Sequence, residues 1–337
     1  MGTTDTIIYV SGGNMSCNQP MFAIPDGVTQ NGKTKYKMIA RYDSEILNLY
    51  PNAVKVPCGK CTGCRADKTR EWADRMILEL DHSKTAVFIT LTYDDNHLPV
   101  FVDLSNGEYI PTLRKRDLQL FMKRLRKCEL FRDRELRYYA CGEYGSHTHR
   151  PHYHLILYGV SKEDFPDLSP RGNNDLGQQY FKSDFLADEI WKKGFCLISD
   201  VSWNTMAYVA RYVKKKRIGL YEDNIKEENE FSVMSRRPGI GMYYIDEHDD
   251  VFNYTKRHIG TENGSIEVFL PKAFLSYLEK TDIDLYVNIK EQRRQAANNE
   301  EFTKLMQTDL SSMELDMIQD EKINKGRDII DRYRTQV

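Results

Sequence analysis

The segment that most constrains the fold is an apolar and aromatic run with two histidines at its start, residues 152–158, HYHLILY. Such a composition favours an extended strand, in which the side chains of residues i and i+2 point to the same face. We therefore expect His152 and His154 to project together, with Tyr153 on the opposite, buried face. The chain is expected to fold around a β-sheet that carries two imidazoles on one face.

Two imidazoles on one strand face can serve as a pair of metal ligands. A second strand is predicted over Leu136–Gly142, and Glu143 at its end could supply a carboxylate to the same metal. His147 and His149, in the short connection between the two strands, compete for that third position. A His-x-His pair by itself more often serves surface or packing roles, so the metal-site interpretation depends on a second motif.

The second motif is a predicted helix with two tyrosines and a basic end, residues 208–216, YVARYVKKK. Positions i and i+4 are neighbours on a helix, so Tyr208 and Tyr212 present two phenols side by side, with Arg211 and Lys215 each three residues after a tyrosine. A phenol has a pKa of about 10 and is a poor nucleophile at neutral pH, but a nearby cation favours the phenolate. The alternative is that the two rings pack into the core, which the basic run makes less favourable.

The order of predicted elements indicates an α+β fold. In chain order they are a helix after Thr62, a strand over Ala86–Tyr93, a hairpin within Asp94–Pro111, a helix opened by Thr112, strands over Leu136–Gly142 and His152–Gly159, a loop over Ser161–Phe181, a helix over Asp184–Trp191, a strand over Phe195–Val201 and a helix over Ser202–Arg217. This order is compatible with an antiparallel sheet covered by helices on one face, of ferredoxin-like type. We expect an irregular leader at 1–53, the main domain at 54–270 and a charged helical extension at 271–337.

Local charge, rather than the net charge of −2, predicts a nucleic-acid surface. From Thr112 to Arg137 there are ten Lys and Arg against four Asp and Glu, and from Ala207 to Arg217 there are five basic residues and no acid. Binding to phosphates depends on such local contacts, although solvated helix faces would give the same pattern. The candidate DNA-binding residues are Arg211, Lys214, Lys216, Lys123, Arg124, Arg126 and Lys127.

Three of the seven cysteines form the motif Cys58-x-x-Cys61-x-x-Cys64, whose spacing suits metal binding or reduced thiols better than disulfides. They could hold a structural Zn²⁺ with a fourth ligand such as Cys128, Cys141 or a histidine. An iron–sulfur cluster would lack a local fourth cysteine, and a turn without metal is equally compatible with the motif. With no run of about 18 apolar residues and no signal-peptide layout, we expect a protein of the reducing cytoplasm.

Together the two motifs resemble the HUH endonucleases of rolling-circle replication, in which His-apolar-His binds a metal and tyrosines cleave DNA. Residues 88–93, FITLTY, look like the first motif of that superfamily, and the Tyr-x-x-x-Tyr pair is similar to that of initiators from small icosahedral single-stranded DNA bacteriophages. Further blocks resemble the replication-associated proteins of gokushoviruses: residues 58–65 (CGKCTGCR), 113–118 (LRKRDL), 142–145 (GEYG) and 235–241 (SRRPGIG).

The resemblance implies a ferredoxin- or RRM-like HUH core and a role for specific residues. His152, His154 and Glu143 would hold Mg²⁺ or Mn²⁺, Tyr208 and Tyr212 would be the nucleophiles, and Lys215 would stabilise phenolate or phosphate. Tyr153 is aromatic where an aliphatic residue is common, which leaves the ligands in place.

The implied activity is a site-specific single-strand DNA endonuclease and ligase that starts rolling-circle replication of a viral genome. Its partners would be viral origin DNA and host proteins such as helicase and polymerase, in the cytoplasm of a bacterial host and with no membrane. A relaxase or single-strand transposase would share this chemistry. From a different class, the cysteines and basic helices would suit a non-catalytic, zinc-dependent regulator that binds nucleic acid.

Overall fold

The computed structural model describes residues 17, 19–29, 34–39, 49–145, 148–173, 179–211, 228–254, 256–261, 264–310, 314, 315, 318 and 321. The chain divides into two compact units. One comprises Met1–Lys68 with Leu275–Val337, and the other comprises Thr69–Phe274. The boundaries predicted after residues 53 and 270 remain predictions.

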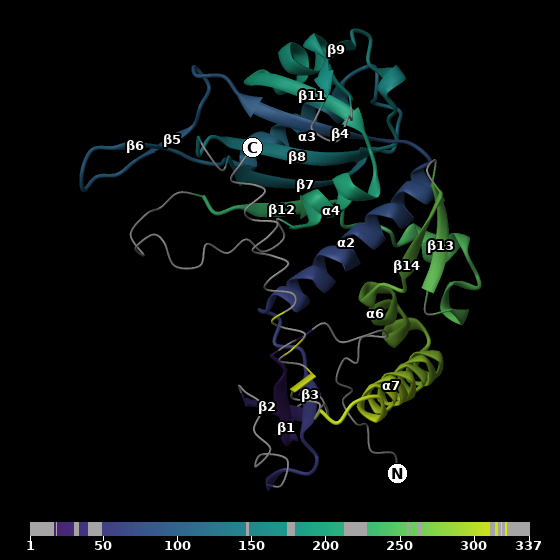
Figure 1. The fold of residues 1–337 in the computed structure, drawn as a ribbon. Helices are drawn as coiled ribbons and strands as arrows, with labels where there is room; N and C mark the ends of the chain where they lie inside the picture. Colours follow the sequence, from purple (N-terminus) through teal and green to yellow (C-terminus); the bar gives the residue numbers. More distant parts are fainter. Residues whose placement is uncertain are drawn as a thin grey trace. The chain divides into compact units, whose positions relative to one another are not determined.

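A large antiparallel sheet forms the centre of the second unit (Figure 1). Its described strands are β4 (Ala86–Tyr93), β7 (Arg137–Tyr144), β8 (Pro151–Tyr158), β9 (Ser169–Asn173), β10 (Gln179–Lys182), β11 (Gly194–Asp200) and β12 (Phe231–Met234). They lie in the order β12-β7-β8-β4-β11-β10-β9, and every neighbouring pair is antiparallel. The predicted α+β class is confirmed. The sequence indicated only a loop where β9 and β10 extend the sheet.

The central four strands have the ferredoxin-like arrangement. The chain runs β4, helix α3 (Lys115–Lys127), β7, β8, the π-helix η2 (Phe185–Trp191) and β11. In the sheet these strands lie in the order β11-β4-β8-β7, so the first strand, β4, lies between the third and fourth strands, β8 and β11, while β7 pairs with β8, the next strand in the chain. This is the split β-α-β pattern that the order of predicted elements suggested.

Helices cover both faces of the sheet, not one face as the sequence suggested. Residues of α3 and η2 pack on one face, against alternate residues of β4 and β8 such as Ile89 and Leu155. On the other face, residues of α2 (Thr62–Ser83) from Ala73 onward and of α4 (Trp203–Arg211) pack against Ile156 and its neighbours. The reason lies in the central strands: β7 and β8 are buried along nearly their whole length, and a strand buried on both faces needs cover on both.

Smaller elements complete the second unit. They are the hairpin β5 (Val100–Val102) and β6 (Tyr109–Pro111), the 3₁₀ turns η1 (Lys162–Asp164) and η4 (Val251–Asn253), α5 (Tyr243–Glu247), and the hairpin β13 (Lys256–Thr261) and β14 (Gly264–Phe269). The hairpin predicted within residues 94–111 is therefore confirmed.

Glu79 of α2 and Arg137 of β7 form a buried ion pair, and both side chains also form hydrogen bonds to the backbone of the loop at residues 235–241. Oε2 of Glu79 accepts a hydrogen bond from the backbone N–H of Gly241 at 2.6 Å, and Nη2 of Arg137 donates to the Gly239 carbonyl at 3.1 Å. Gly241 has a φ of +76°, and a Cβ there would lie 2.6 Å from the carbonyl oxygen of Arg75. Glycine is therefore required at this position for both reasons.

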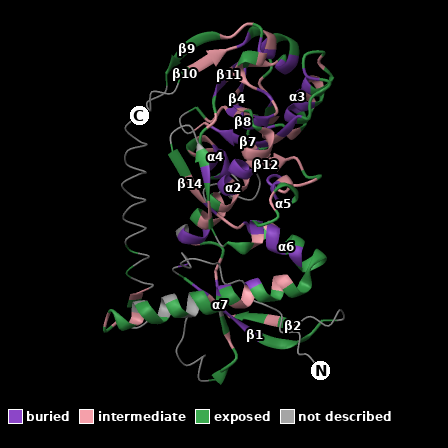
Figure 2. Cartoon of the chain, turned by 90° about the vertical axis from the view of Figure 1, so that its right-hand side faces the viewer, coloured by how far each residue is buried: buried purple, intermediate pink, exposed green. Residues whose placement is uncertain are grey.

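The first unit contains a small antiparallel sheet in the order β2-β1-β3. Its strands are β1 (Met21–Val28), β2 (Thr34–Ile39) and β3 (Val54–Val56). Two of these strands, β1 and β2, lie within residues 1–53, and Phe22, Ala23 and Ile24 form a short buried run in β1. Helix α6 (Lys272–Thr281) spans the boundary between the units, and α7 (Ile283–Met306) presents mostly exposed residues (Figure 2).

Within the described part of the chain, none of the helices has the length and apolar character needed to cross a membrane.

Candidate active site

The registers of three adjacent strands gather the predicted metal ligands on one face of the sheet. Glu143 of β7 lies directly opposite His152 of β8, and Thr90 of β4 lies directly opposite His154. Since residues i and i+2 share a face, both imidazoles point to the side covered by α2 and α4. Tyr153 points to the other side and is fully buried, as predicted.

The side chains of Glu143, His152 and His154 form a compact group. Oε1 of Glu143 lies 2.8 Å from Nε2 of His152 and 2.8 Å from Nε2 of His154. One ligand atom from each residue lies within 4.8 Å of the others. Glu143 and His154 are buried, whereas the side chain of His152 is 19% exposed, so His152 is the most accessible member of the group.

This group fits a divalent cation. Nε2 of His154 is shielded from solvent, and its polar contact of 2.8 Å with Oε1 of Glu143 does not have hydrogen-bond geometry, so its lone pair can bind a metal that Glu143 shares. Two imidazole nitrogens and one carboxylate oxygen suit Mn²⁺ and also Mg²⁺, and three protein ligands leave coordination positions for a substrate.

Both imidazoles are oriented by a partner on their other nitrogen. Nδ1 of His152 lies 3.0 Å from the carbonyl oxygen of Arg150, which can only accept, so Nδ1 carries a proton there. Nδ1 of His154 lies 2.9 Å from Oγ1 of Thr90. Nε2 of His152 is then left as its metal-binding atom, and Nε2 of His154 is left in the same way when Nδ1 of His154 donates to the Thr90 hydroxyl group. This role of Thr90 was not predictable from the sequence, because the position of Thr90 opposite His154 depends on strand register.

We expect Thr90→Val to weaken the binding of Mn²⁺ by about 10- to 100-fold, because the substitution removes the partner that orients His154. Titration calorimetry on the purified protein measures the affinity. Thr90→Ser keeps the hydroxyl group and should restore binding. Equal affinities for Thr90→Val and the unmodified protein would show that Thr90 does not position the imidazole.

The charges in the group support metal binding near neutral pH. Burial alone raises the pKa of Glu143, but its contacts with the two imidazoles outweigh burial and hold that pKa well below its usual range. Burial dominates at His154 and lowers its pKa. At His152 the burial effect is outweighed by Glu143, which raises the pKa. Protons therefore compete with a metal mainly at His152, and metal affinity should fall as the pH falls through its raised pKa.

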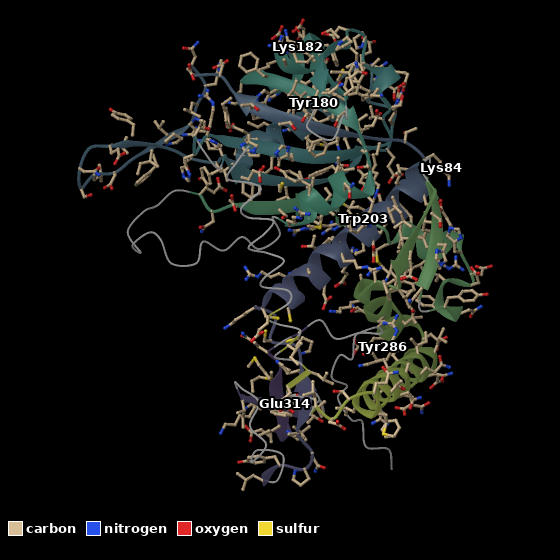
Figure 3. All side chains as sticks on the ribbon, viewed as in Figure 1. Lys84, Tyr180, Lys182, Trp203, Tyr286 and Glu314 are labelled. Carbon is tan, nitrogen blue, oxygen red and sulfur yellow. The ribbon has the colours of Figure 1, made fainter. Side chains whose placement is uncertain are left out.

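Helix α4 directs Tyr208 toward this group. The helix is fixed at its start by reciprocal hydrogen bonds: the Ser202 N–H donates to Oγ1 of Thr205, and the Thr205 N–H donates to Oγ of Ser202. Trp203 marks this first turn in Figure 3. One turn further on, the hydroxyl group of Tyr208 donates to Oε1 of Glu143 at 2.9 Å, and its ring meets the His154 ring edge-on at 5.2 Å.

Only some of the other predicted site residues are among the described residues. Arg211, the last residue of α4, is exposed. Tyr212, Lys214, Lys215 and Lys216 lie outside the described residues, as does His147. The ring of His149 stacks on that of Tyr144 at 4.5 Å, so Glu143 is the third ligand that the geometry favours.

The four cations predicted on α3 lie on the helix that covers the opposite face of the sheet. Arg124 donates to the carbonyl oxygens of Ile190 and Trp191, and burial lowers its pKa. Arg126 donates to the carbonyl oxygen of Leu136. These two arginines therefore brace the fold. The DNA-binding role of Lys123, Arg124, Arg126 and Lys127 remains a prediction.

A family model described as replication-associated protein ORF2/G2P matches residues 86–217, which include β4, both histidines and α4. The chain is 30% identical over 275 residues to the replication-associated protein ORF2 of Spiroplasma virus 4, covering 78% of this chain and 80% of that protein. It is 29% identical over 229 residues to replication-associated protein VP4 of Bdellovibrio phage phiMH2K (66% and 68%). It is 28% identical over 236 residues to replication-associated protein ORF4 of Chlamydia phage 1 (67% and 54%).

No solved structure matches the chain significantly. The similarity to the Spiroplasma virus protein extends over most of both sequences, far beyond the two short motifs. The chain therefore belongs to the family of replication-associated proteins found in these bacterial viruses.

Proposed function

We propose that this protein initiates rolling-circle replication of a viral genome by cutting one strand of the origin DNA and forming a covalent phosphotyrosine. The observation that carries the proposal is the hydrogen bond of 2.9 Å between the Tyr208 hydroxyl and Oε1 of Glu143, the oxygen that also contacts both imidazoles. A tyrosine nucleophile and a metal site are thereby joined in one group. Membership in a family of replication-associated proteins supports the same role.

The proposed metal ligands are Nε2 of His152, Nε2 of His154 and Oε1 of Glu143. A bound Mg²⁺ or Mn²⁺ would polarise the scissile phosphate and offset its negative charge. The low pKa of Glu143 makes it a weak base, so its carboxylate orients the phenol rather than keeping the proton.

In the reaction, the phenol oxygen of Tyr208 gives up its proton to water and forms a bond to phosphorus, while the bond from phosphorus to O3′ breaks and water supplies the proton that O3′ needs. The leaving O3′ takes up a proton and becomes a free hydroxyl, and the other strand end stays on the protein as a 5′-phosphotyrosine. Joining the ends reverses these steps and needs no nucleotide cofactor, since the bond energy is kept in the phosphotyrosine. Tyr212 would serve the next strand transfer, and Lys215 would stabilise the phenolate or phosphate.

The proposed partners are viral origin DNA and, inside the bacterial host, a helicase and a polymerase that extends the free 3′ hydroxyl. A relaxase or single-strand transposase would use the same chemistry, but the family relationship favours a replication initiator. A non-catalytic regulator would have no use for a tyrosine hydroxyl group hydrogen-bonded to the carboxylate that contacts both histidines.

The test uses single-stranded oligonucleotides that tile the genome encoding the chain, each labelled at its 3′ end. With Mn²⁺ present, we expect one oligonucleotide to give a labelled protein–DNA adduct that survives denaturation. The other product of the cut, the 5′ fragment of the same oligonucleotide, should end in a free 3′ hydroxyl group that a polymerase can extend. EDTA should abolish both products. If none of the tiled oligonucleotides forms an adduct in Mn²⁺ or Mg²⁺, the nuclease proposal is wrong.

A further inference from the structure

In the structure, a fourth cysteine that is distant in sequence joins the motif of Cys58, Cys61 and Cys64. Cys17 lies next to Cys58, Cys61 and Cys64, and the four sulfur atoms lie within 4.8 Å of one another. The sulfurs of Cys58 and Cys64 are 4.0 Å apart, and those of Cys61 and Cys17 are 3.9 Å apart. The suggested alternatives Cys128 and Cys141 are not part of this group. Yellow sulfur atoms gather at the N-terminal end of α2 in Figure 3.

We propose that Cys17, Cys58, Cys61 and Cys64 bind one Zn²⁺ ion as a structural site of the first unit. Tetrahedral zinc with Zn–S bonds of about 2.3 Å requires sulfurs about 3.8 Å apart, close to the two separations given above. A disulfide would bring two sulfurs to about 2.05 Å, and all four cysteines are free thiols. An iron–sulfur cluster places bridging sulfide between its irons, so at least two of its cysteine sulfurs would lie farther apart than they do here.

Backbone N–H groups point at these sulfurs, as they do around thiolates. Cys17 Sγ accepts from the Cys58 N–H at 3.2 Å. Cys58 Sγ accepts from the N–H groups of Lys60 and Cys61 at 3.4 and 3.3 Å, and Cys61 Sγ accepts from that of Cys64 at 3.4 Å. A neutral thiol is a weak acceptor, whereas a thiolate attracts such donors. These hydrogen bonds are independent of the sulfur spacing and indicate the same site.

The local fold explains why the cysteines converge. Gly59, with a φ of +71° and nothing within 4 Å of where a Cβ would lie, allows the tight turn between Cys58 and Cys61. Cys64 lies near the start of α2, where the helix dipole favours a negative sulfur. Cys17 precedes β1 and is 41 residues away from Cys58. A metal here would close a long loop and tie the region before β1 to the turn that leads into α2.

The first experiment measures metal content by mass spectrometry in full-length protein expressed with zinc. We expect about one zinc per chain that persists in His154→Ala, which excludes the histidine site as its source. Cys17→Ser should lower the zinc content at least tenfold. Cys128→Ser is the matched control, since it removes a cysteine outside the group and should leave zinc unchanged. Absence of zinc, iron in its place, or full zinc content in Cys17→Ser would overturn the proposal.

A second measurement on the unmodified protein covers the case in which Cys17→Ser does not fold. Brief alkylation followed by peptide mass spectrometry should find Cys17, Cys58, Cys61 and Cys64 protected while zinc is bound. The same four should react together after a strong chelator removes it. Substitution by Co²⁺ should give thiolate-to-cobalt charge-transfer bands typical of tetrahedral sulfur coordination. Alkylation of Cys17 in zinc-loaded protein would show that it is not a ligand.

Discussion

Tyr208→Phe should lower formation of the first covalent protein–DNA adduct by on the order of 10³-fold or more, because it removes the oxygen that attacks phosphorus. The phenylalanine ring can keep the edge-on contact with His154, so the fold and Mn²⁺ affinity should be preserved. The adduct is quantified with a 3′-labelled origin strand under single-turnover conditions. Binding of the same strand without metal should be nearly unchanged.

Two further tyrosine variants test whether the loss of adduct is specific to Tyr208. Tyr109→Phe, on the exposed strand β6, removes a phenol far from the proposed chemistry in sequence and should leave the adduct yield unchanged. Tyr212→Phe should retain the first adduct, because the hydroxyl group of Tyr208 is hydrogen-bonded to Glu143, one of the proposed metal ligands. The assignment of Tyr208 as first nucleophile is lost if Tyr208→Phe forms the adduct normally while Tyr212→Phe does not.

Glu143→Gln should weaken Mn²⁺ binding by at least about 100-fold, because it replaces a proposed charged ligand, whereas Thr90→Val removes only a residue that orients a ligand. The loss of adduct should follow the loss of metal and be partly reversed by high Mn²⁺ concentration. The substitution also removes the group that raises the pKa of His152, so this pKa should fall in the metal-free variant. Calorimetry and an NMR titration of the imidazoles measure the two effects.

Glu230→Gln provides the matched control for charge alone. Glu230 also acts electrostatically on His152, and its Oε1 accepts a hydrogen bond from the Tyr144 N–H at 3.3 Å, but it does not belong to the proposed ligand group. We expect only a small loss of Mn²⁺ affinity from this variant. Equal losses in Glu143→Gln and Glu230→Gln would mean that negative charge near His152 matters and that Glu143 is not a ligand.

In the second unit, local sequence patterns predicted individual strands and helices but not how they pack. The strand containing His152 and His154 was predictable, because apolar and aromatic composition and the two-residue alternation of side chains are properties of a few consecutive residues. The start of the helix carrying Tyr208 was predictable from helical periodicity. The cover on both faces of the sheet was missed, because the burial of a strand face depends on residues far away in the chain.

The cysteine group shows most clearly which part of a site cannot be predicted from local sequence. The three cysteines at residues 58–64 were recognisable from their spacing, which is local. Cys17 lies 41 residues before Cys58 in an N-terminal segment with weak periodicity, and nothing near it in sequence indicates a ligand. Its place beside the motif follows from the pairing of β1 with β3, which is a tertiary contact.

By itself, the sequence determined which residue types could carry the chemistry: two histidines on one strand face, a carboxylate at a strand end and a tyrosine on a helix. Only the tertiary structure decided that these side chains meet. Strand register sets Glu143 opposite His152 and Thr90 opposite His154, and the packing of α4 brings Tyr208 within 2.9 Å of Glu143. The physical reason is that side-chain direction follows from local backbone geometry, whereas register and helix packing are fixed by contacts distributed over the whole unit.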